Sequence, residues 1–258
     1  MLPLFKSHYS IGKSILTLDS PGESNACGSD SILDIAKEHS LSEVILVEDS
    51  LTGFMQAMNI CESIGINLIF GLRLSCYNSE VSLGDSQTSH KIIIFPKNKE
   101  GCSLLNKIYT HAFCEDGGEI KEKSLLALFN PDLLKLAVPF YDSFIFNNLT
   151  MLGSACAPLS NFTDIEPTFF IEENQLPFDG MVKEAVLSYC EKSGFEYEPV
   201  KSIYYKKRTD FEAYQTHKCI CGRSFSASRS LSTPKQDHLG SEEFCFESYL
   251  DYESSHSN

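Results

Sequence analysis

Apolar runs of strand length alternate with amphipathic helical segments along most of the chain, and this alternation limits the fold more than any single motif. The apolar runs span residues 42–49, 66–77, 90–98, 133–140, 142–148, 167–174 and 196–205, and the helical segments span residues 29–40, 53–65, 99–113 and 180–194. The lengths of these segments suit helical crossovers between parallel strands. The order therefore predicts an α/β protein with a barrel-like or doubly wound sheet.

Two helix ends can be placed from residue type. Ser29, Asp30 or Ser31 is expected to cap the first helix, because a short polar side chain can accept from the free N–H groups of its first turn. Gly65 follows the second helix and is expected to end it in a left-handed conformation.

Composition sets the broad class. With 258 residues and 42% hydrophobic content, the chain can bury a sizeable core. Its formal net charge of −14 opposes direct, tight binding to nucleic acid, because phosphate neutralisation needs Lys and Arg. Without an apolar run of membrane-spanning length or a secretory signal, we expect a cytoplasmic protein with no membrane contact. The ten cysteines lie in apolar runs and are expected to be reduced thiols.

The character of the sequence changes after about residue 217. Residues 223–243 are Ser-rich and polar, and a short apolar element follows before the polar tail. We predict a barrel domain over 1–216, followed over 217–258 by a Ser-rich linker and a C-terminal extension. His217, Cys219 and Cys221 are zinc-ligand types, but their spacing departs from the usual two residues between paired cysteines.

Glu48 and Asp49 stand where the apolar run Ile45–Val47 ends. A buried parallel strand that ends in carboxylates is how α/β barrels present catalytic groups or metal ligands. This pair is therefore the first candidate site in the sequence. His90 begins a later strand, where a surface histidine is the simpler interpretation.

Several segments together, in order, resemble the polymerase-and-histidinol-phosphatase (PHP) domain of the bacterial DNA polymerase III alpha subunit, in a degenerate stand-alone version. The segments are "SHYSIG", "SEVILVEDSLTGFMQAMNICESIGINLIFGLRLSCY", "HKIIIFPKNKEGCSLLNKIYTHAF", "VKSIYYKKRTDFEAYQTHKCICGRSF" and "SEEFCFESYLDY". The resemblance implies a distorted (β/α)7 TIM-like barrel, the PHP fold, with a short C-terminal extension. It also implies phosphoester hydrolysis, in some members as a 3′–5′ exonuclease, with Zn, Mn or Fe at the carboxyl ends of the strands.

Most of the family's metal ligands are replaced when they are carried over one by one. Only His90 is retained among them, and Asp49 takes the place of a metal-binding histidine in the acidic turn. The degenerate positions are Leu4, Lys6, Lys13, Glu48, Asp49, Arg73, His90, Ser202 and Tyr204. A shift of one residue in the first turn would bring His8 in as a ligand and would still leave too few.

The replacements predict the loss of the hydrolytic site. Lys6 and Arg73 would place fixed positive charge in the metal region, and Glu48 or Asp49 is expected to pair with them. We therefore predict no catalytic residues, no metal and no cofactor. If metal is bound, the resemblance implies Zn or Mn on His90, Asp49 and Glu48.

The leading functional hypothesis is a catalytically inactive platform in bacterial or phage DNA replication, a pseudo-hydrolase that is not a polymerase on its own. Its expected partner is a DNA polymerase subunit or a proofreading exonuclease. The alternative is a metal-dependent phosphoesterase or 3′–5′ exonuclease with a reduced metal site. A third class, a purely structural or virion protein, stays open.

Overall fold

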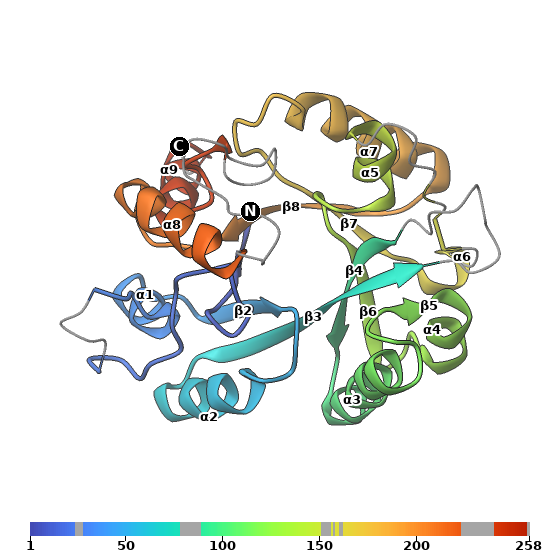
Figure 1. Cartoon of the computed structure of the whole chain (residues 1–258), viewed down its shortest axis with the longest axis horizontal. Helices are drawn as coiled ribbons and strands as arrows, with labels where there is room; N and C mark the ends of the chain where they lie inside the picture. The colour runs from blue at the N-terminus through green and yellow to red at the C-terminus, as the bar shows by residue number, and fades with distance from the viewer. Residues whose placement is uncertain are drawn as a thin grey trace. The chain divides into compact units, whose positions relative to one another are not determined.

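The computed structural model describes residues 1–23, 28–77, 89–150, 156, 158–159, 162–222 and 240–256 (Figure 1). The strands are β1 (Leu2–Phe5), β2 (Glu43–Glu48), β3 (Asn67–Tyr77), β4 (His90–Pro96), β5 (Ile120–Lys121), β6 (Leu134–Val138), β7 (Thr168–Ile171) and β8 (Tyr197–Ile203). The helices are α1 (Ile32–Glu38), α2 (Phe54–Ile64), α3 (Lys99–Cys114), α4 (Glu122–Leu128), α5 (Phe144–Thr150), α6 (Phe162–Ile165), α7 (Asp179–Ser193), η1 (Arg208–Asp210), α8 (Phe211–Cys221) and α9 (Phe246–His256). The predicted linker falls largely on residues 223–239, which lie outside this description.

Strand pairing confirms the predicted fold class. The strands follow the order β2-β1-β8-β7-β6-β4-β3-β5, and a further pairing of β2 with β3 closes the first seven into a hydrogen-bonded ring. A closed ring of strands connected by helices is a distorted α/β barrel of seven strands. The short strand β5 pairs in parallel with the end of β3 and stands outside the ring.

One strand departs from the expected parallel arrangement. β4 is antiparallel to both of its neighbours, β3 and β6. The connection from β3 to β4 has twelve residues, 78–89, which is at the lower limit for a parallel crossover. β4 therefore departs from the parallel crossovers that the segment lengths suggested.

The helix ends follow the residue types that precede and follow them. Among the three cap candidates, Ser31 is the residue that caps α1, since its hydroxyl accepts from the N–H of Leu33. Gly65 ends α2 with φ of 73°, in the left-handed region that a residue with a Cβ enters at a cost. Gly65 leads the chain into β3, which begins at Asn67.

The chain divides into two compact units. Unit 1 comprises residues 1–70, 173–176 and 200–258, and unit 2 comprises residues 71–172 and 177–199. β3 and β8 contribute residues to both units. The predicted boundary between residues 216 and 217 falls within α8 and stays a prediction.

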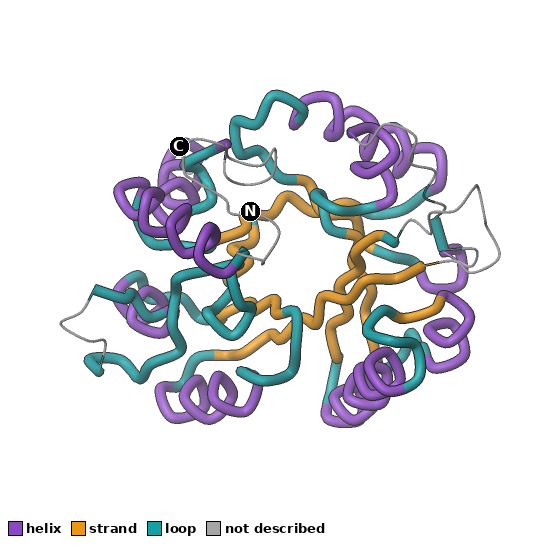
Figure 2. The backbone as a smooth tube through the Cα atoms, viewed as in Figure 1, coloured by secondary structure: helices purple, strands orange, loops and turns teal. Residues whose placement is uncertain are grey.

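In unit 2, helices cover one face of the strands with an apolar layer. α3 contacts β4 and β5, and α7 contacts β7 (Figure 2). Rings from α5, α6, β7, α7 and the turn after α7 form a continuous aromatic cluster of Phe144, Phe162, Phe169, Tyr189 and Phe195. Aromatic rings bury large apolar areas, so this cluster contributes to the core of unit 2.

In unit 1, the C-terminal segment 240–256 is part of the core. Phe246 is 1% exposed and lies with its ring centroid 5.8 Å from that of Phe5 on β1. Phe244, which is fully buried, stacks on Tyr204 just after β8 at 5.5 Å. Removing these rings from water contributes substantially to folding, so the segment is an integral element of unit 1.

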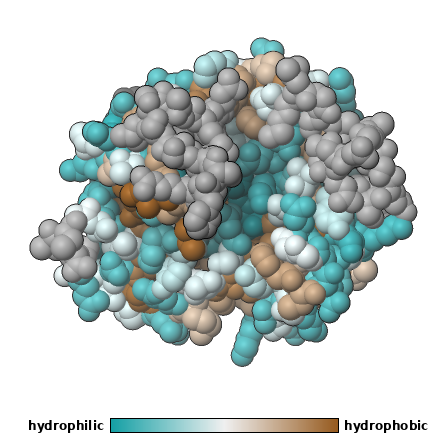
Figure 3. All heavy atoms as spheres, in the orientation of Figure 1, coloured by the Kyte–Doolittle hydropathy of each residue, from teal (hydrophilic) through white to brown (hydrophobic). Residues whose placement is uncertain are grey.

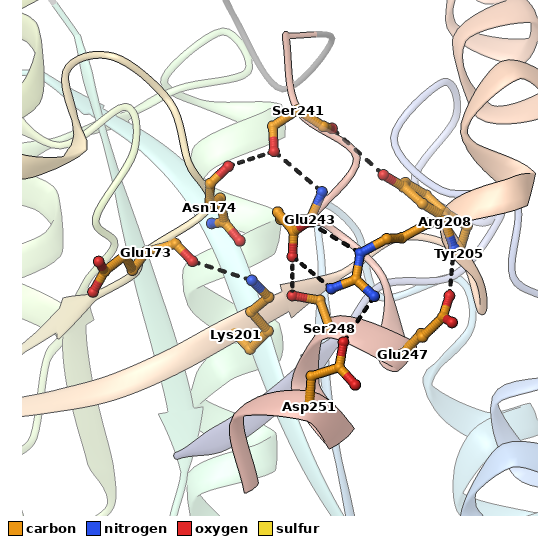
Figure 4. Close-up of polar contacts among 10 residues, drawn as sticks. All are labelled: Glu173, Asn174, Lys201, Tyr205, Arg208, Ser241, Glu243, Glu247, Ser248 and Asp251. Carbon is orange, nitrogen blue, oxygen red and sulfur yellow. Dashed lines mark hydrogen bonds and ion pairs between the residues drawn. The ribbon is translucent and has the colours of Figure 1, made fainter. Parts of the chain in front are cut away.

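A polar network centred on Arg208 holds the same segment (Figure 4). Arg208 donates from Nε and Nη2 to the two carboxylate oxygens of Glu243, each at 3.0 Å, and from Nη1 to Asp251 at 2.8 Å. The backbone N–H of Arg208 donates to Glu247. Hydrogen bonding to Arg208 holds the pKa of Glu243 below its usual value. The guanidinium of Arg208 therefore holds two carboxylates of the C-terminal segment, and its backbone N–H holds a third.

The surface is mainly polar. Most described residues on the face drawn in Figure 3 are hydrophilic, in keeping with the net charge of −14. The large apolar side chains that are exposed are Ile11, Met55, Phe113, Leu149, Met181, Tyr197 and Ile220. None of the described helices has the length and apolar content needed to cross a membrane.

Replacing Phe246 by Ala tests whether segment 240–256 belongs to the core. We expect the free energy of unfolding to fall by about 3–5 kcal/mol, the range for deleting a buried phenylalanine ring. Urea denaturation followed by circular dichroism measures the loss. Ile220→Ala is the matched control, because Ile220 is 58% exposed and its loss should change the stability little. Equal effects of the two substitutions would contradict the packing described here.

Candidate functional site

The nine positions carried over from the resemblance divide between the two units. Arg73 and His90 belong to unit 2. The others belong to unit 1: Leu4, Lys6, Lys13, Glu48, Asp49, Ser202 and Tyr204.

Strand register brings the first part of the site together in unit 1. Leu4 on β1 pairs with Ile45 on β2 and with Ser202 on β8. Paired residues direct their side chains to the same face of a sheet, and successive residues alternate between faces. Lys6 follows β1 and Asp49 follows β2, so both stand at the carboxyl ends of neighbouring parallel strands.

Lys6 and Asp49 form an ion pair at this edge. Lys6 Nζ lies 3.0 Å from Asp49 Oδ1. The side chain of Lys6 is 5% exposed, whereas that of Asp49 is 32% exposed, so a buried ammonium group meets a carboxylate at the surface. Burying a cation without an anion is costly, and this contact satisfies Lys6. The pairing expected from the sequence is therefore present for Lys6.

Glu48 has a different environment, although it is adjacent to Asp49 in sequence. Its carboxylate is fully buried, accepts the N–H of Ser7 at 2.7 Å and accepts the hydroxyl of Ser10. Burial raises the pKa of Glu48, and Lys6 together with the serine hydrogen bonds opposes the rise. The Ser10 hydroxyl also accepts the N–H of Asp49. Glu48 thus fastens the loop after β1 to the end of β2.

The remaining positions in unit 1 contribute no ligand chemistry. Leu4 is buried, and Lys13 is exposed in the turn that follows β1. Tyr204 is buried between the rings of Tyr214 and Phe244. His8, the residue that a one-residue shift would introduce, is exposed and lies against the ring of Tyr9.

In unit 2, Arg73 is paired with a carboxylate that the sequence reasoning missed. Arg73 lies in β3, is 9% exposed, and donates from Nη2 to Asp142 Oδ2 at 2.7 Å. Asp142 follows β6 and is 43% exposed at its side chain. Its φ of 62° is in the left-handed region, and its carbonyl accepts the N–H of Lys91. Asp142 therefore binds β3 through its side chain and β4 through its backbone.

Register places His90 on the opposite face of the β3–β4 ladder from Arg73. His90 is paired with Cys76, and Arg73 is paired with Ile93. Cys76 lies three positions after Arg73 on β3, so the two side chains project to opposite faces of the sheet. The one retained family ligand therefore faces away from Arg73.

The surroundings of His90 are those of a core residue. It is 4% exposed, its ring lies edge-on to Phe144, and its Nδ1 is 3.6 Å from Cys156 Sγ. Burial lowers the pKa of His90 to about 4, so the imidazole is neutral at pH 7. Its Nε2 is buried and has no hydrogen-bond partner among the described residues. Packing against an aromatic ring and a thiol explains its burial without a metal.

These residues do not fit the divalent ions that the resemblance implies. Metal ions need several anionic or imidazole ligands that converge on one point. An ammonium group already holds Asp49, Glu48 is enclosed by hydrogen-bond donors, and His90 packs against apolar side chains. Over the part of the chain that is described, no group of three or more His, Cys, Asp or Glu side chains is placed to hold a metal ion. What the arrangement offers chemically is a set of fixed ion pairs.

Comparison with known proteins finds similarity in structure and none in sequence. No protein-family model and no curated protein match the sequence. A protein of Bifidobacterium adolescentis, provisionally assigned as a metal-dependent phosphoesterase, is similar in structure with a TM-score of 0.42 and 10% sequence identity. The similarity covers 78% of this chain and 87% of that chain.

Replacing Glu48 by Gln tests the buried carboxylate. A raised folded-state pKa means that the stability contributed by Glu48 is full below its unfolded pKa and is lost as pH rises through the folded value. Gln does not titrate, so the stability of Glu48→Gln relative to the natural chain should increase as pH rises above about 4.5, the ordinary pKa of Glu. Chemical denaturation at a series of pH values measures this difference.

Glu243→Gln provides a control of opposite sign. The pKa of Glu243 is lowered by Arg208, so its contribution is present above the unfolded pKa and is lost as pH falls. The stability of Glu243→Gln relative to the natural chain should therefore decrease as pH rises. Parallel slopes for the two variants would show that the local environments assigned here are wrong.

Proposed function

We propose that this chain is a non-hydrolytic barrel of the PHP type that serves as a protein-binding platform. The observation that carries the proposal is the ion pair of Lys6 with Asp49, since it occupies the two positions where the resemblance expects metal-binding histidines. A lysine ammonium cannot coordinate a metal, and its charge repels a divalent cation nearby. A barrel of this type whose metal-ligand positions are occupied by other residues supports a role in binding.

Arg73 supports the same proposal independently. It stands where the family has a metal-binding glutamate, and it carries fixed positive charge held by Asp142. Arginine stays protonated at any physiological pH, so deprotonation cannot turn it into a ligand. Metal-dependent hydrolysis requires a metal ion that activates water. In this chain, the side chains Lys6 and Arg73 place positive charge where the metal ligands of the family would stand.

The partner proposed is a component of a DNA replication machine, either a polymerase body or a proofreading exonuclease. This part of the proposal rests on the resemblance. The net charge of −14 supports a protein partner with a basic surface over direct contact with a polyanion. Complementary charge would also speed the encounter at low salt.

Metal content and hydrolysis test the first half of the proposal. After incubation with Zn²⁺ or Mn²⁺ and gel filtration, metal analysis should find well below one ion per chain, and phosphodiester hydrolysis should not exceed the buffer rate. Stoichiometric metal with hydrolysis that is lost in both Asp49→Asn and His90→Ala would overturn the proposal in favour of a reduced metal site.

Affinity capture tests the second half. The tagged chain is recovered from its native cells with nuclease present, and the bound proteins are identified by mass spectrometry. We expect a polymerase subunit or a proofreading exonuclease at near-stoichiometric yield, and less of it as salt increases, because charge complementarity is screened. Recovery of no replication protein at low salt would refute this partner class.

A further inference from the structure

The face of unit 2 that carries Arg73 also carries other hydrogen-bond donors. Ser75 is paired with Lys91, so both lie on the same face as Arg73. Lys91 Nζ donates to the Ser75 hydroxyl, which keeps its own hydrogen for donation. A guanidinium, a hydroxyl and an ammonium thus lie on one face of the β3–β4 ladder.

The register of the next strands identifies what else shares this face. Ile93 pairs with Ala137 on β6, which pairs with Thr168 on β7. Continued alternation places buried Glu172, just past the end of β7, on the same face. Near the carboxyl ends of β3, β6 and β7, the charged residues that the register and the loop after β6 bring to this face are two cations, Arg73 and Lys91, and two carboxylates, Glu172 and Asp142. Lys135 and Glu198 share the face at its opposite end.

Asp142 differs from Glu172 in its exposure to water. Its side chain is 43% exposed, and its backbone is anchored by a separate hydrogen bond from the N–H of Lys91. This backbone anchor does not depend on the side chain, so the loop keeps it when the side chain turns toward water. The φ of Asp142, 62°, is uncommon for a residue with a Cβ, and such outliers gather at ligand sites.

We propose that Arg73, Ser75 and Lys91 form a carboxylate-binding site. In the free chain the carboxylate of Asp142 occupies this site, and a carboxylate of the partner protein displaces it on binding. With Asp142 turned away, the face keeps one net positive charge, which suits a single carboxylate better than a phosphate dianion. The high negative charge of the whole chain likewise disfavours a strongly acidic peptide. This inference rests on the proposed platform function and names the chemistry of one contact with the partner.

Acetate is the probe for this site, because it is the end group of an Asp or Glu side chain. Sodium acetate replaces sodium chloride at constant ionic strength, and the backbone amide of Lys91 is followed by ¹⁵N NMR. We expect a saturable shift of that amide. The half-saturating concentration should fall about tenfold or more in Asp142→Asn, because an intramolecular competitor acts at an effective concentration in the millimolar range or above.

Two further variants complete the test. Arg73→Gln should abolish the saturable shift, and Ser75→Ala should weaken it several-fold while leaving both cations in place. Lys206→Gln, which removes an ion pair with Glu38 in unit 1, should behave as the natural chain does.

Three outcomes would overturn the proposal. They are an unchanged half-saturating concentration in Asp142→Asn, saturable binding that survives Arg73→Gln, and a response to inorganic phosphate stronger than the response to acetate. The titration needs neither metal nor partner, so its failure is distinguishable from failure of the platform proposal.

Discussion

Strand pairing fixes the face to which each side chain points, and this constraint decides which charged groups of the barrel can meet. Arg73 and His90 both occupy family positions, yet the register of β3 with β4 sends them to opposite faces. Glu48 and Asp49 are adjacent in sequence and have separate partners, Ser7 and Ser10 for one and Lys6 for the other. Residues that match family positions in the sequence therefore need not meet in one site in the folded chain.

The buried cations Lys6 and Arg73 each have an anionic partner within their own unit. Lys6 and Arg73 are nearly enclosed, and each meets a carboxylate that is itself partly exposed. The anion keeps much of its hydration in such a pair, so the desolvation cost is lower than for a fully buried pair. The gain in stability is correspondingly modest, because partly exposed pairs contribute about 0–1 kcal/mol. Both pairs are better understood as fixing position than as driving folding.

Much of the fold could be predicted from the sequence, because hydrophobic periodicity and the residue types at helix ends are local features. Most of the apolar runs and helical segments fall on β2, β3, β4, β6, β7, β8, α1, α2, α3 and α7, whereas the apolar run 142–148 lies largely in helix α5. The left-handed end of α2 at Gly65 was also predictable from the sequence, since glycine tolerates that conformation. The direction of β4 was not readable, because the pattern of a buried strand is the same in parallel and antiparallel pairs.

The site was less predictable for a related reason. The partner of Arg73, Asp142, is 69 residues away in sequence, and its only local signal is that it follows an apolar run. The Ser7 and Ser10 contacts with Glu48 likewise depend on where a loop folds back onto the next strand. Residue type supplied the candidates, and only register and loop geometry could say which of them meet.

The C-terminal segment shows how a short apolar element can anchor a polar stretch of chain. Residues 217–258 are polar overall, and the apolar element expected after residue 243 contains Phe244 and Phe246, which are almost completely buried. Three carboxylates from the segment converge on Arg208, which is the reason that so acidic a stretch can pack against unit 1. Arg208 brings a single positive charge to three carboxylates, so the cluster still contributes negative charge to the long-range field of the protein. The contacts therefore fix the position of the segment, and the net charge of −14, which already counts Arg208, is the charge that a partner meets.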